Sequence, residues 1–202
     1  MLFKVLASIS LLGALAAIAG LGTYATFTST TSASTSALAS GAVQIALGTP
    51  GPANRLTLGA NGLLPGDTMQ RAADLANTGV ASSDPLASIT LTTTASPSSL
   101  IDTDATNGLQ MAIDSCSAAW TESGVSPAFT YTCVGTTNVV LASRAVTGVN
   151  VALSNLASLA PATTDHLRIT LTLPATAPNT LQALSSTLTY TFTGSQRTAT
   201  SK

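Results

Sequence analysis

Few side chains in this chain could carry out chemistry. Its only histidine is His166 and its only glutamate is Glu122. A catalytic zinc ion needs three protein ligands and an open position, yet the chain contains no H-E-x-x-H pattern. His166 could join two aspartates, with Asp165 adjacent, but Arg168 shares its side of an alternating strand and opposes a cation. A Ser-His-Asp triad lacks the G-x-S-x-G elbow. We therefore expect no catalytic residue, and zinc at His166 is a weak alternative.

A second candidate is the acidic stretch that begins at Asp102 and Asp104, which is similar to the start of a calcium loop. Thr106 stands at the third acidic position, the glycine comes one residue late at Gly108, and Ile113 replaces the closing glutamate. The pattern therefore favours a polar turn with no bound cofactor, and calcium at Asp102 and Asp104 is the weaker alternative.

The two cysteines, Cys116 and Cys133, show no C-x-x-C spacing, so a structural zinc site is not indicated. In an exported chain they would form a disulfide, worth about 3 kcal/mol in the chain-entropy model. Such a bond would pin the excursion around Trp120 against its parent strand. Two buried thiols in a reducing compartment are the alternative.

The N-terminal sequence indicates whether the chain is exported or stays in a reducing compartment. Lys4 precedes an apolar run from Leu6 to Leu21, and the small residues Thr23 and Ala25 follow it. This order is typical of a secretory signal, so we predict cleavage between Ala25 and Thr26 and a secreted or cell-surface product. A retained anchor is the alternative, because residues 5–25 are long enough to span a membrane.

The composition of the body limits its partners. Only 7% of the residues are charged and the net charge is −1, so the basic stripe of a nucleic-acid-binding protein is missing. A hydrophobic fraction of 45% argues against a disordered chain. Abundant Thr and Val suit a pleated surface, and low charge favours association between molecules.

Alternating apolar residues predict about nine strands and no long helix, which indicates an all-β antiparallel sandwich. The clearest strands cover 167–173 and 188–193, and only 179–184 could hold a helical turn. The others are expected at 42–47, 55–58, 68–75, 86–94, 109–113, 139–141 and 149–153. We predict a signal at 1–25, a flexible Ser/Thr/Ala leader and possible donor strand at 26–40, a sandwich at 41–197 and a tail at 198–202.

Several motifs in this order resemble the TasA/camelysin family of secreted bacterial proteins with a SipW-type signal boundary. They are GTYATFTS at the junction, ASG at 39–41, LPGD at 64–67, NTG at 77–79 and LTYTFTGSQ at 188–196. The resemblance implies a jelly-roll version of the sandwich. The cysteine pair is not general to this family and resembles an actinobacterial-looking subset.

The resemblance also implies a function, namely a subunit of an extracellular or biofilm-matrix fibre. The segment that follows the signal would pair with the next subunit by β-strand addition, with Phe27, Val43 and Ile45 as anchors. Alternatively, residues 42–47 pair within their own chain and residues 26–35 donate. The expected partners are further copies of the chain, a signal peptidase and an accessory matrix protein, with membrane contact only through the uncleaved signal.

Two other functions remain open from the sequence. Camelysin-type members are described as metallo-endopeptidases, so a secreted metalloprotease is one alternative. A surface-anchored adhesive β-sandwich is the other. Fold alone cannot choose among them.

Overall fold

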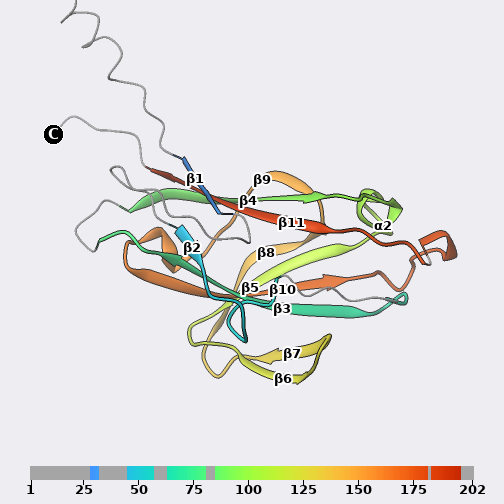
Figure 1. Ribbon diagram of the computed structural model, residues 1–202, viewed down its shortest axis with the longest axis horizontal. Helices are drawn as coiled ribbons and strands as arrows, with labels where there is room; N and C mark the ends of the chain where they lie inside the picture. The colour runs from blue at the N-terminus through green and yellow to red at the C-terminus, as the bar shows by residue number, and fades with distance from the viewer. Residues whose placement is uncertain (1–27, 32–44, 57–62, 81–84, 182, 197–202) are drawn as a thin grey trace, which may run out of the picture.

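The computed structural model describes residues 28–31, 45–56, 63–80, 85–181 and 183–196. Two antiparallel sheets pack face to face (Figure 1), and a separate hairpin lies outside one of them. Sheet A has the order β1-β11-β4-β9, and sheet B has the order β2-β3-β10-β5-β8. The orders β1-β11-β4-β9 and β3-β10-β5-β8 are those of a jelly roll, the double Greek key of eight strands. The expected all-β sandwich is therefore confirmed.

The strands of sheet A follow the predicted alternation. They are β1 (Thr28–Thr31), β4 (Leu86–Ala95), β9 (Gly148–Ala152) and β11 (Leu188–Gln196). Side chains of β4 and β11 that point inward, such as Ile89, Leu91 and Phe192, are fully buried. The residues between them are mostly Thr and face outward, because successive strand residues point to opposite sides.

Sheet B forms the other half of the core. Its strands are β2 (Ile45–Leu47), β3 (Thr68–Asn77), β5 (Gln110–Cys116), β8 (Thr137–Ala145) and β10 (Thr163–Thr172). Leu167, Ile169 and Leu171 of β10 point into the core, as the alternation predicts. Arg71 of β3 is a charged residue that is nevertheless buried, and it pairs with Ile169 of β10. Its Nη1 donates to the carbonyl oxygen of Gln70 at 2.6 Å. Burial lowers the pKa of this guanidinium.

The strand expected at residues 55–58 is wrong in its described part, because residues 55 and 56 lie outside any strand. Residues 57–58 lie outside the described ranges. The expected helical turn is the 3₁₀ segment η2 (Asn179–Leu181). Elements that the alternation does not predict are the short helix α2 (Leu100–Thr103), the 3₁₀ segment η1 (Ala157–Leu159), and strands β6 (Thr121–Val125) and β7 (Ala128–Thr132).

Candidate functional site

A disulfide holds the β6–β7 hairpin to the outer side of sheet B. Cys116 ends β5, Cys133 follows β7, and their Cα atoms are 5.8 Å apart. The pairing that the sequence predicts is therefore present. The hairpin forms a two-stranded sheet of its own, and β7 packs against β3. Figure 1 shows it outside the two main layers, below β3 and β10.

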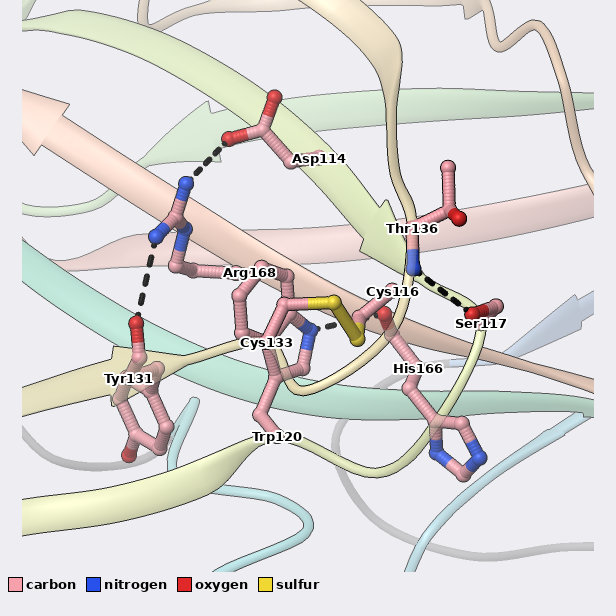
Figure 2. The surroundings of a disulfide bond; sticks show 9 residues. All are labelled: Asp114, Cys116, Ser117, Trp120, Tyr131, Cys133, Thr136, His166 and Arg168. Atoms are coloured by element: carbon pink, nitrogen blue, oxygen red, sulfur yellow. Dashed lines mark hydrogen bonds and ion pairs between the residues drawn. A yellow bond between two sulfur atoms is a disulfide. The ribbon is translucent and has the colours of Figure 1, made fainter.

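Trp120 and Arg168 fill the space beside this disulfide (Figure 2). The guanidinium carbon of Arg168 lies 4.5 Å from the centroid of the Trp120 ring, within the range of a cation–π contact. Trp120 Nε1 donates to the carbonyl oxygen of His166 at 2.8 Å. Arg168 also donates to Asp114 Oδ2 at 2.8 Å and to the carbonyl oxygen of Tyr131 at 3.3 Å. One arginine of β10 thus contacts the residue before β6 and a residue of β7, at the open end of the hairpin.

A second cluster holds the hairpin from the segment that follows β2. Arg55 makes two hydrogen bonds to the carboxylate of Glu122, at 2.9 and 2.8 Å, and lies 4.7 Å from the centroid of the Phe129 ring. The Tyr131 hydroxyl donates to the same carboxylate at 2.8 Å. The hydrogen bond from Arg55 lowers the pKa of Glu122. Burial, followed by the bond to Glu122, raises the pKa of Tyr131 to about 12.

The structure does not bring His166 and Asp165 together in one metal site. His166 Nδ1 lies 2.7 Å from Asp74 Oδ1, across the pair of β10 with β3. Asp165 points to the opposite side, where it is buried and accepts from the backbone N–H groups of Ala157 and Ser158 at the start of η1. The half-buried His166 therefore belongs to an outward pair, while its neighbour caps a 3₁₀ segment.

The two aspartates of the predicted calcium loop are used by the chain itself. Asp102 is buried and accepts from Ser98 Oγ, from the Ser99 backbone N–H and from Ser186 Oγ. Asp104 is half-buried and accepts from the backbone N–H groups of Thr106 and Asn107 in its own turn. Each carboxylate thus has a structural role in the fold.

Replacing Asp102 by asparagine should lower the free energy of unfolding by about 2 kcal/mol at neutral pH, because hydrogen bonds to a charged group are worth about 1.5–3 kcal/mol. Burial alone raises the pKa of Asp102, but the bonds from Ser186, Ser99 and Ser98 outweigh it and hold the pKa below its usual value. A lowered folded-state pKa stabilises the protein above the unfolded-state pKa, and this contribution is lost as pH falls through the folded-state value. Urea unfolding in neutral buffer and in strong acid should show the wild-type advantage disappear.

The N-terminal junction supplies the other candidate site. β1 pairs antiparallel with β11, with Thr28 opposite Ser195 and Thr31 opposite Phe192. The described part of the leader is thus a strand of this chain's own sheet A. Ile45 is buried in β2 and pairs with Asn77 of β3. The remaining predicted junction and anchor residues lie outside the described residues: Ala25, Thr26, Phe27 and Val43.

No metal-binding group emerges among the residues that the structure describes. Within them, no three His, Cys, Asp or Glu side chains are placed to hold one ion. The weak candidates Asp102, Asp104 and His166 are not brought together, because the aspartates contact the α2 segment and His166 contacts β3. None of the helices in the described ranges is long and apolar enough to cross a membrane.

These features define a jelly-roll β-sandwich with a disulfide-held outer hairpin. The chain belongs to the camelysin metallo-endopeptidase family, whose model matches residues 4–201. Comparisons with curated proteins and with solved structures give no match. The resemblance to the TasA/camelysin family is thereby confirmed.

Proposed function

We propose that this protein is a secreted structural subunit that assembles into an extracellular fibre by β-strand addition. The observation that carries the proposal is the pairing of β1 with the edge of β11. β1 begins two residues after the predicted new N-terminus at Thr26, and it contacts β11 as a paired antiparallel strand. Strand addition relies on backbone hydrogen bonds, so the same register is open to β1 of another copy.

The length of the β11 edge supports this proposal. β11 extends over Leu188–Gln196, but β1 pairs only with residues 192–195, so the described residues place no partner strand beside 188–191. The β8 edge of sheet B is different, because side-chain and backbone groups already occupy part of it. Asn155 Nδ2 and the Ser154 backbone N–H donate to the carbonyl oxygens of Val139 and Val140 in β8. Such contacts hinder edge-to-edge pairing at this strand.

Exchange of β1 between copies is head to tail, because the donor strand and the acceptor strand are different surfaces. A contact of this kind does not close on itself and generates a filament. Cleavage after Ala25 would be required first, since it releases the start of β1 from the signal segment. The predicted signal peptidase is in this sense the trigger for assembly.

The double substitution Ser29→Pro/Thr30→Pro should abolish fibres while leaving the sandwich folded. Proline removes the backbone donor that strand pairing needs, and substituting two successive residues covers both orientations of the N–H groups. Mature protein beginning at Thr26 is examined by negative-stain electron microscopy, with circular dichroism as the check on folding. Ser29→Ala/Thr30→Ala is the matched control and should assemble like the wild type. Fibres of the proline variant, or a wild type that stays monomeric at high concentration, would contradict the proposal.

The family description favours a second candidate, a secreted metallo-endopeptidase. The same mature protein can be incubated with casein in the presence and absence of a chelator. Cleavage that the chelator stops would support the protease and would require metal ligands beyond the described residues. An adhesive sandwich is the third candidate, and binding of mature monomers to a surface without fibres would support it.

A further inference from the structure

The turn between α2 and β5 contains the dipeptide Asn107-Gly108, a sequence that is prone to spontaneous deamidation. In this reaction the backbone nitrogen of the glycine attacks Cγ of the asparagine, so an N–Cγ bond forms and the Cγ–Nδ2 bond breaks. The proton given up by the glycine leaves with ammonia, and a cyclic imide remains. Water then opens the imide to give aspartate or isoaspartate. Glycine favours the attack because it has no side chain to hinder the approach.

The fold requires the glycine of this dipeptide. Gly108 is buried, and a Cβ atom there would overlap the carbonyl oxygen of Asp104 and lie 2.8 Å from that of Ile101. Both carbonyl groups are fixed by hydrogen bonds, because the Gly108 N–H donates to the first at 2.9 Å and the Leu109 N–H donates to the second at 2.7 Å. A larger residue therefore has no room, and the reactive dipeptide is retained.

Asp104 accepts hydrogen bonds from three N–H groups of the dipeptide. The Asn107 backbone N–H donates to Oδ1 at 2.9 Å, and Asn107 Nδ2 donates to Oδ2 at 3.2 Å. The third bond is the one from Gly108 to the Asp104 carbonyl oxygen. The backbone bonds from Asn107 and Thr106 lower the pKa of Asp104, so its carboxylate is charged in the alkaline solutions that promote deamidation.

These contacts oppose each step of the reaction. Deprotonating Gly108 breaks its bond to the Asp104 carbonyl and leaves a negative nitrogen beside that oxygen. Turning the Asn107 amide toward this nitrogen breaks the bond between Nδ2 and Oδ2. The attack then places negative charge on the Asn107 side-chain oxygen near the Asp104 carboxylate, and like charges repel. Reaction is therefore expected only in molecules whose turn has opened locally.

We propose that Asn107-Gly108 is a latent deamidation site that Asp104 keeps unmodified while the α2–β5 turn is closed. The inference does not depend on whether the protein forms fibres. Opening of the turn would leave a permanent chemical mark, because isoaspartate lengthens the backbone by a methylene group and aspartate adds a second carboxylate beside Asp104. The dipeptide thus records local unfolding at the end of the sandwich where Figure 1 shows α2.

The first test compares Asn107 in the folded and the unfolded chain. Purified protein is incubated in mildly alkaline buffer with and without urea, and peptide mapping by mass spectrometry follows the conversion of amide to acid. Without urea, Asn107 should react at least about tenfold more slowly, because hydrogen bonds to a charged carboxylate must break first. Equal rates at Asn107 in the two solutions would overturn the inference.

The second test is Asp104→Asn, which removes the charge and one acceptor oxygen at nearly constant size. In buffer without urea it should speed deamidation of Asn107 at least about tenfold. Asn61-Gly62, the same dipeptide outside the described ranges, is an internal reference whose rate should not change. Circular dichroism checks that the variant is folded. If it is not, Asp104→Ser replaces it, since serine keeps an acceptor oxygen in a neutral side chain, and the expected result is the same.

The matched control is Asp67→Asn, at another turn aspartate. Asp67 is exposed and accepts from the Leu64 backbone N–H at 2.8 Å, so its substitution should leave the Asn107 rate at the wild-type value. An Asp104→Asn rate equal to the wild-type rate would show that the carboxylate gives no protection. A lower rate would make Asp104 a general base that promotes the reaction. Either result would overturn the inference.

Discussion

Truncating Phe192 to alanine is expected to lower the free energy of unfolding by about 3–5 kcal/mol. Phe192 is fully buried at the centre of β11, and its register partner in β4 is the equally buried Leu91. Removing the ring loses its transfer free energy and leaves a cavity that a close-packed sandwich closes only in part. Urea unfolding followed by circular dichroism measures the change as a shift in midpoint at constant slope.

The matched control is Thr191→Ala, one residue earlier in the same strand. Thr191 points outward, so its truncation removes little buried surface and should change the free energy by no more than about 0.5 kcal/mol. The contrast tests the inside–outside assignment of β11 directly. A loss below about 1 kcal/mol for Phe192→Ala, or equal losses for both variants, would contradict the packing described above.

The strands that build the core could be predicted from the sequence because their alternation is strict. Leu167, Ile169 and Leu171 alternate with polar residues, and this period fixes which side of β10 is buried. The same rule separates His166 from Asp165, which a reading of adjacent letters as one metal site overlooks. Neighbours in a strand face opposite ways, so the alternation that predicts β10 also argues against a metal site shared by His166 and Asp165.

Strand β1, in the leader, could not be predicted from apolar alternation. β1 has the sequence TSTT, which contains no apolar alternation. It pairs with the edge of β11 through its backbone, and backbone pairing leaves no hydrophobic pattern in the sequence. The α2 segment did carry a local signal. Ser99 and Asp102 form a capping box, and the S-x-x-D spacing is the pattern that marks such a helix start.

The β6–β7 hairpin could not be predicted from the sequence for a different reason. Its strands are mostly exposed, and the residues that hold it are distant in sequence: Arg55 contacts Glu122, and Arg168 contacts Trp120. Such cation–π and ion-pair contacts depend on how β3 and β10 are placed by the fold, which local patterns do not specify. Only the cysteine pair signalled that the segment between Cys116 and Cys133 returns to its starting point.

Removing the disulfide with Cys116→Ser/Cys133→Ser is expected to lower the free energy of unfolding by about 3 kcal/mol. The bond closes a loop with a sequence separation of 17, and its loss returns conformational freedom to the unfolded chain. Trp120 lies within this loop and is the only tryptophan, so its fluorescence reports the hairpin while circular dichroism reports the sandwich. We expect Trp120 emission to shift to the red in lower urea than the loss of β-structure, because the covalent link between the hairpin and sheet B is then gone.

Reduced wild-type protein is the natural control, since it loses the same bond without a substitution and should match the double variant. A reductant should leave the variant itself unchanged. Non-covalent contacts still hold the hairpin after the bond is gone, and the ion pairs among them remain in partial contact with solvent, which weakens each pair. The residues concerned are Arg55, Glu122, Arg168 and Trp120. If stability falls by less than about 1 kcal/mol and Trp120 emission stays coincident with circular dichroism, these contacts suffice by themselves. The disulfide would then be dispensable, and the hairpin would be part of the cooperative sandwich rather than a layer attached to it.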